Sequence, residues 1–148
     1  MEPEVGRDMH KDAESVWEVL ADGWFYPLWV VGATHMRDVD ADWPAVGSRL
    51  HHSVGVWPFQ LRDHTEVLDV DPGRRLELLA RAWPAGTAHV RLTLQARGPD
   101  SCHVRMWEAA ADRPWRWIPD WAQAPAVRPR NAECLSRLAD IAEHRRHV

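Results

Sequence analysis

Residues Thr87-Ala-His-Val-Arg-Leu-Thr-Leu-Gln-Ala-Arg97 carry the clearest indication of the fold class of this chain. Apolar residues occupy every second position of its central part: Val90, Leu92, Leu94 and Ala96. This two-residue period is typical of a β-strand with one buried and one exposed face. The turn residues Gly98-Pro99-Asp100 follow, and a second alternating run then places these residues on one face: Cys102, Val104, Met106 and Glu108. The two runs predict an antiparallel hairpin.

Further alternating runs extend this hairpin toward the N-terminus. They cover Gly47–Val56, Arg62–Val70 and Arg75–Trp83, and turn signals follow at Asp71-Pro72-Gly73 and Pro84-Ala85-Gly86. A thin first strand, in which Val5 and Met9 are the apolar residues, comes before them. We therefore expect a curved antiparallel sheet of about six or seven strands.

The helical signals lie near the two ends of the chain. After Asp12, a residue type that caps helices, Ala13–Ala21 has apolar residues at helical spacing, and Trp24–Val31 predicts a second short helix or a turn. The segment Asp112–Pro129, with four prolines and three tryptophans, predicts a long loop with room for one helical turn, and Arg130–His147 predicts a long amphipathic helix. Because one face of the sheet must be covered, we expect this last helix to lie across it. The prediction is a single α+β domain over residues 1–148, with two short helices after the first strand.

Length and charge narrow the class of protein. A chain of 148 residues fits one domain, which buries roughly 70% of its unfolded surface without a disulfide framework. The 22 acidic and 18 basic residues give a net charge of −4, which argues against a partner nucleic acid. The N-terminal residues are acidic and lack an apolar core, so we expect no signal peptide, and no apolar run reaches the roughly 20 residues that span a bilayer. We predict a cytoplasmic protein without stable membrane insertion. Lys11 is its only lysine, and this preference for arginine suggests a bacterial genome rich in G and C.

Several segments resemble a known family. Tyr26-Pro-Leu-Trp29 with Gly32, Val46-Gly-Ser-Arg-Leu50 and Glu66-Val-Leu-Asp-Val-Asp-Pro-Gly-Arg-Arg-Leu76 are similar to parts of the START-like helix-grip superfamily. The resemblance to SRPBCC proteins of the polyketide cyclase/dehydrase and lipid-transport type extends from about Val5 to Glu143. It implies a helix-grip fold with a hydrophobic cavity between the sheet and the C-terminal helix, used for lipids, polyketides or other flat apolar molecules. It does not imply one reaction, since the family includes aromatase/cyclases, carriers and proteins that act through partners.

Ten tryptophans are the most unusual feature of the composition. Six of them lie in segments expected to rim the cavity: Trp24, Trp29, Trp57, Trp115, Trp117 and Trp121. Flat side chains there favour an aromatic or polycyclic ligand through stacking and buried area, although core and lid packing would use the same residues. The further residues expected to contact the ligand are Val54, Phe59, Leu78, Leu92, Met106 and Leu135.

Polar residues on apolar faces are the candidates for chemistry. Glu108 and His52 each share a strand face with apolar neighbours, and burial raises the pKa of a carboxyl group into a range that suits a general acid or base. We take these two as the candidate catalytic pair. The alternative for Glu108 is a position at a strand end that returns to solvent. The alternative for His52 is a hydrogen-bonded histidine of the core. Asn131, near the predicted start of the last helix, is a candidate ligand contact or a helix-start hydrogen bond.

Three functions follow from these features. The first is a protein, monomeric or homodimeric and without a cofactor, that binds a hydrophobic, aromatic or polycyclic small molecule. The second is a polyketide cyclase-like or dehydratase-like enzyme with His52 and Glu108 as acid and base. The third is a protein-interaction module that uses the tryptophan-rich loop 112–129. We expect no metal site, because the adjacent His51 and His52 point to opposite faces of a strand.

Overall fold

A computed structural model describes residues 4–30, 33–54, 61–81, 87–111 and 119–144 of the chain. Its elements are β1 (Glu4–Met9), α1 (Ala13–Ala21), the 3-10 helix η1 (Gly23–Phe25), α2 (Tyr26–Trp29), β2 (Ala33–Val39), β3 (Arg49–Val54), β4 (Leu61–Asp71), β5 (Arg75–Arg81), β6 (Thr87–Gly98), β7 (Ser101–Ala110) and α3 (Asp120–His144). The seven strands form one antiparallel sheet in the order β1-β7-β6-β5-β4-β3-β2. The predicted sheet and its strand count are confirmed.

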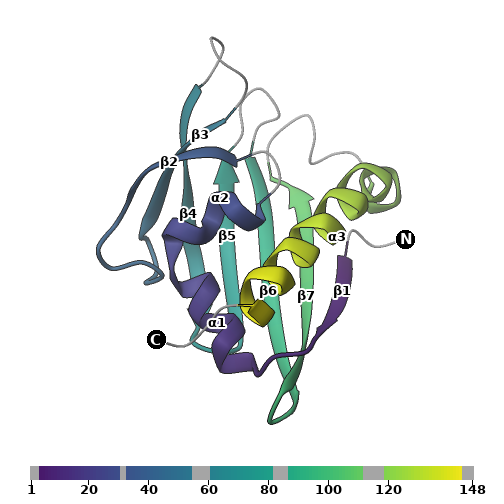
Figure 1. The fold of residues 1–148 in the computed structure, drawn as a ribbon. Helices are drawn as coiled ribbons and strands as arrows, with labels where there is room; N and C mark the ends of the chain where they lie inside the picture. Colours follow the sequence, from purple (N-terminus) through teal and green to yellow (C-terminus); the bar gives the residue numbers. More distant parts are fainter. Residues whose placement is uncertain (1–3, 31–32, 55–60, 82–86, 112–118, 145–148) are drawn as a thin grey trace.

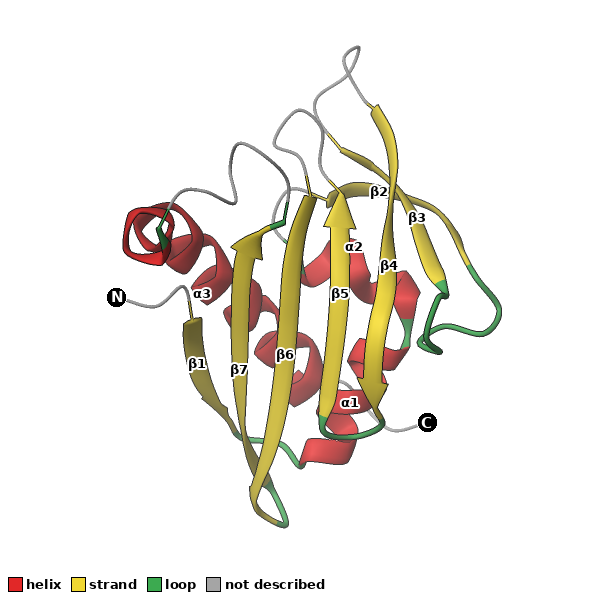
Figure 2. Cartoon of the chain, turned by 180° about the vertical axis from the view of Figure 1, so that it is seen from behind, coloured by secondary structure: helices red, strands yellow, loops and turns green. Residues whose placement is uncertain are grey.

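The helices gather on one face of this sheet. Figure 1 shows α3 crossing in front of the strands with α1 and α2 beside it, and Figure 2 shows the opposite face from behind. None of the helices in the described part is long and apolar enough to span a membrane. The sheet therefore has an inner face toward the helices and an outer face away from them, and these two names are kept below.

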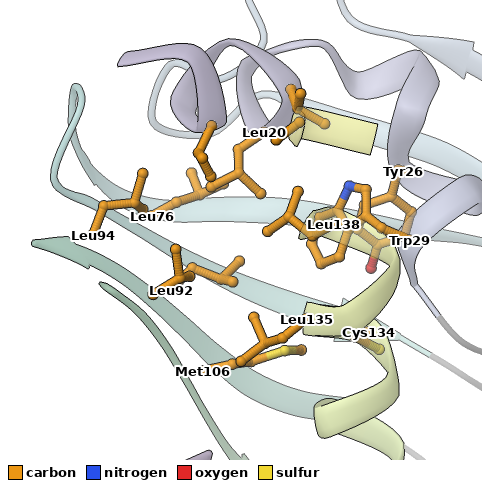
Figure 3. Close-up of a cluster of buried hydrophobic side chains, with 14 of the residues drawn as sticks. Leu20, Tyr26, Trp29, Leu76, Leu92, Leu94, Met106, Cys134, Leu135 and Leu138 are labelled. Carbon is orange, nitrogen blue, oxygen red and sulfur yellow. The ribbon is translucent and has the colours of Figure 1, made fainter. Parts of the chain in front are cut away.

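Strand register aligns the apolar residues of the inner face in rows. One row pairs Leu76 with Leu92 and Leu92 with Met106, and all three are at most 3% exposed. Leu135 and Leu138 of α3 pack over this region and are likewise buried (Figure 3). The alternation seen in the sequence thus gives a core between sheet and helix, because side chains at every second position point to the same face.

The N-terminal helices form as predicted. The Asp12 carboxylate accepts a hydrogen bond from the backbone N–H of Ser15 at 3.0 Å, which satisfies one free amide of the first turn of α1. The second helical segment divides into η1 and α2, and the Asp22 carboxylate accepts from the backbone N–H of Trp24 at 3.2 Å. This short segment turns Tyr26 and Trp29 toward the inner face, where both are buried.

The last helix is longer than predicted. It begins at Asp120 instead of Arg130, so residues 120–129 are helical and the predicted loop over 112–129 is wrong in that part. Pro125 and Pro129 each remove a backbone donor, but residues 120–129 also include three alanines, and alanine has the highest helix propensity. In Figures 1 and 2 the first turns of α3 run at an angle to the rest, as expected where prolines interrupt the hydrogen-bond ladder.

Candidate functional site

One polar group on the inner face joins α2 to β3 and β4. Tyr26 Oη lies 3.2 Å from Thr65 Oγ1, and His52 Nε2 lies 2.8 Å from the same oxygen. The rings of Tyr26 and His52 are stacked with centroids 5.7 Å apart, and Trp29 meets Tyr26 edge-on at 5.5 Å. All four side chains are buried. Thr65 therefore links the phenol and the imidazole inside the fold.

Burial keeps this first group uncharged. Desolvation raises the pKa of Tyr26 to about 12 and lowers the pKa of His52, so the phenol is protonated and the imidazole is neutral near pH 7. His52 Nε2 is used by Thr65, whereas His52 Nδ1 is buried without a hydrogen-bond partner in the part of the chain that the structure describes. The imidazole thus keeps one free polar atom directed at the interior.

A second polar group joins β7 to α3. The guanidinium of Arg130 donates to the carboxylate of Glu108, which is buried by its position on the inner face of β7. Desolvation raises the pKa of Glu108, and the charge and hydrogen bond of Arg130 oppose that rise. The result is an ion pair placed at the boundary between core and solvent, since the Arg130 side chain is 42% exposed.

Asn131 lies beside this ion pair and is only 1% exposed. It lies close enough to the Glu108 carboxyl group to help lower the pKa of that group. Even so, neither atom of its amide makes a hydrogen bond of ordinary geometry within the described residues. Because α3 begins at Asp120, Asn131 lies well inside the helix, and the helix-start hydrogen bond does not account for it.

Small residues separate the two polar groups along the inner face. Thr65 pairs with Ala80, Ala80 with Ala88, and Ala88 with Ala110. The next inner row carries larger side chains over most of its length: Val67, Leu78, Val90 and Glu108. Alanine side chains end at Cβ, so this row carries less side-chain volume than the row of Val67, Leu78 and Val90 beside it.

His52 and Glu108 do not contact one another. They lie on β3 and β7, which are four strand steps apart, or about 19 Å along the sheet. Tyr26 interacts with both sides. Its ring stacks on His52, and the charges of Glu108 and Arg130 both affect its pKa. The two residues of the candidate catalytic pair share the inner face, but any chemistry that uses both would need a ligand reaching from one to the other.

The other predicted contacts divide into three sets. Four of them lie in the buried core between the sheet and α3: Leu78, Leu92 and Met106 on the strands, and Leu135 on α3. Trp29 is buried against Tyr26, while Trp24 is 56% exposed. Trp57, Phe59, Trp115 and Trp117 lie outside the described residues. Val54 and Trp121 belong to β3 and α3, and their side chains lie outside the described part.

Sequence reasoning missed Tyr26, Thr65 and Arg130. Tyr26 is the only tyrosine of the chain and stands in the quoted Tyr-Pro-Leu-Trp segment. Thr65 alternates with Val67, and Arg130 precedes Cys134 of the apolar stripe by one helical turn. These signals were present, but only the tertiary contacts distinguish them from ordinary surface positions. Within the described ranges, no three His, Cys, Asp or Glu residues lie together in a way that could hold a metal ion.

The sequence matches no protein-family model and no curated protein. Solved structures do resemble it. A conserved protein from Geobacillus kaustophilus aligns with a TM-score of 0.72 and 12% identity over 97% of this chain and 96% of its own. The Zhui aromatase/cyclase from Streptomyces sp. R1128 aligns with a TM-score of 0.66 and 16% identity over 96% of this chain and 93% of its own. The di-domain aromatase/cyclase StfQ of the steffimycin biosynthetic pathway aligns with a TM-score of 0.68 and 15% identity over 95% of this chain and 44% of its own. The protein therefore has the helix-grip fold of these structures, a curved antiparallel sheet packed against a long C-terminal helix.

Proposed function

We propose that the protein binds a hydrophobic, aromatic or polycyclic small molecule between the inner face of the sheet and α3. The observation that carries the proposal is the burial of His52 Nδ1 and Asn131 Oδ1, neither of which makes a hydrogen bond to another described residue. An unpartnered buried polar atom costs about 1–3 kcal/mol. Such atoms are rare in folded proteins, and a bound ligand is one way to satisfy them.

The row of alanines supports a flat ligand. Ala80, Ala88 and Ala110 carry little side-chain volume between the two polar groups, and the neighbouring core is aliphatic. A planar apolar body would lie over this row. A polar atom at one of its ends would reach His52 Nδ1, and an oxygen at the other would reach the Asn131 amide. This assigns the ligand an apolar body with polar groups on its periphery.

The proposal is tested by titrating the purified protein, stripped of carried-over lipid, with fatty acids, flavonoids and polycyclic aromatics. Ten tryptophans make intrinsic fluorescence a sensitive readout. Ala88→Leu would add volume to the alanine row of the inner face, and Asn131→Leu would remove one polar contact. We expect saturable quenching in the parent protein, loss of binding in Ala88→Leu and weaker binding in Asn131→Leu.

Ala109→Leu is the matched control for added volume. Ala109 neighbours Glu108 in β7, so strand alternation directs its side chain to the outer face. The Ala109→Leu variant should therefore bind the ligand as tightly as the parent protein does. A flat response to every compound would contradict the proposal, and so would equal binding by the Ala88→Leu and Ala109→Leu variants.

A cyclase-like or dehydratase-like enzyme is the second candidate. The raised pKa of Glu108 and the neutral imidazole of His52 favour it, because burial moves the pKa of the carboxyl group toward neutral pH and a neutral imidazole can accept a proton. Once a ligand class is identified, Glu108→Gln should abolish turnover and leave binding largely intact. Unchanged turnover would remove Glu108 from the mechanism.

A further inference from the structure

The outer face carries a hollow that the proposed interior site does not use. Its volume is about 320 Å³, and its lining residues come from the end of β4, the β4–β5 turn, β5, β6 and β7. Figure 2 shows β5, β6 and β7 side by side, with the β4–β5 turn at one end of the sheet. Thr93, Gln95 and Arg105 line it, and each is the strand neighbour of a buried inner residue. Strand alternation therefore directs these side chains outward, away from α3.

Register places two arginines on either side of a hydroxyl group. Arg75 of β5 pairs with Thr93 of β6, and Thr93 pairs with Arg105 of β7. Adjacent strands are about 4.8 Å apart, so the two arginine backbones are about 10 Å apart with Thr93 between them. Arginine side chains are long enough to converge on one ligand above the hydroxyl. Arg74, in the β4–β5 turn, lines the same hollow.

The hollow has a surplus of positive charge. Its three guanidiniums face one carboxylate of the lining, that of Asp71. Arg75 is bound by Asp69, whose Oδ2 lies 2.6 Å from its Nη2, and His103 is bound by Asp8 at 2.7 Å. Within the described ranges Arg74 and Arg105 form no ion pair, and Arg75 Nε is buried without a hydrogen-bond partner. Unused donors thus gather here in a protein whose net charge is −4.

We propose that this outer hollow binds the phosphate group of a phosphate monoester. Because Arg75 is paired with Asp69, Arg74 and Arg105 face Asp71 and leave a surplus of one positive charge, which favours an anion. The phosphate of a monoester carries a charge of about −1.5 to −2 near pH 7, and its three oxygens can accept from all three guanidiniums. A carboxylate, with one charge and two oxygens, would use fewer of these donors. Arginine forks suit phosphate oxygens because they donate in pairs. The volume exceeds that of the phosphate alone and lies at the lower end of small-molecule pockets, so the hollow also admits part of the esterified alcohol.

The test is calorimetric titration of the full chain with phenyl phosphate, with benzoate as the carboxylate of matched size. Arg105→Gln removes one lining guanidinium at an exposed position, and Arg97→Gln removes the same charge from an exposed position of β6 that does not line the hollow. We expect saturable binding of phenyl phosphate that weakens about tenfold or more in Arg105→Gln. Arg97→Gln should change it by no more than about twofold, since exposed charges outside the site are screened.

A second arm distinguishes a soluble ester from a lipid head group. Phosphatidylcholine vesicles with and without phosphatidic acid are sedimented with each variant. Binding to phosphatidic acid that depends on Arg105, without binding of phenyl phosphate, would assign the site to a lipid head group. Binding of phenyl phosphate that depends on Arg105 would assign it to a soluble monoester. Equal weakening in both arginine variants, equal affinity for benzoate, or no saturable binding in either arm would overturn the proposal.

Discussion

Replacing Arg130 with glutamine tests how the fold holds a charge in its interior. Arg130 is the only ion-pair partner of Glu108 in the described part of the chain, and Glu108 is buried on the inner face of β7. Glutamine keeps most of the length of the side chain and its ability to donate a hydrogen bond, but removes the positive charge. We expect the Arg130→Gln variant to fold and to be less stable at pH 7.

The magnitude follows from the exposure of the two partners. Removing one member of a fully buried ion pair costs about 3–5 kcal/mol. The Glu108 side chain is 9% exposed and that of Arg130 is 42% exposed, so solvent already screens part of their attraction. We therefore expect a loss of about 2 kcal/mol in the free energy of unfolding at pH 7.

The sign of the pH dependence is fixed by the pKa of Glu108. Burial raises that pKa above its ordinary value of 4.5, so the folded state binds the proton more tightly than the unfolded state. The resulting stability is fully present below 4.5 and is lost as the pH rises through the folded pKa. Without Arg130 the pKa rises further and the loss extends to higher pH. The variant and the parent should therefore approach equal stability below 4.5.

Urea unfolding followed by tryptophan fluorescence at pH 7 and below 4.5 measures both effects. Arg137→Gln is the matched control, because it removes the same charge from an exposed pair of α3 in which Arg137 Nε lies 3.1 Å from Glu133 Oε1. That variant should lose at most about 0.5 kcal/mol. In a Glu108→Gln background, Arg130→Gln should cost little. Equal stability of Arg130→Gln and Arg137→Gln at pH 7 would refute the reasoning.

Three further variants test other parts of the fold. Thr65→Val removes the hydrogen-bond partner of His52 Nε2, so we expect a loss of about 1–3 kcal/mol in the free energy of unfolding and a changed ¹⁵N NMR shift of the imidazole. An unchanged shift would show that the bond is not formed. Asp12→Ala removes the cap of α1 and should cost about 1 kcal/mol in urea unfolding, so a cost near zero would count against the cap. Leu138→Ala, at a fully buried position, should lower the free energy of unfolding by about 2–5 kcal/mol. A loss under about 1 kcal/mol would show that this position is loosely packed.

Elements with local sequence signals could be predicted without the structure. The alternation in Thr87–Arg97 and the turn at Gly98-Pro99-Asp100 predicted β6 and β7 to within a few residues, because side-chain direction in a strand has a period of two. Ala13–Ala21 was predicted with its bounds, since the cap and the helical spacing lie within one short segment. The same rules directed His52 and Glu108 to the inner face, where both are buried.

Tertiary structure decided which polar residues meet. Arg130 and Glu108 are 22 positions apart, and Tyr26 and Thr65 are 39 apart, so no local pattern could pair them. The N-terminal turns of α3 were missed because proline predicts a helix end, and only the assembled chain shows that the helix continues through Pro125 and Pro129. The row of alanines and the arginines of the outer hollow come from strand register, which depends on how non-local strands align. The composition gives the number of these residues, whereas their positions side by side follow from the register of the sheet.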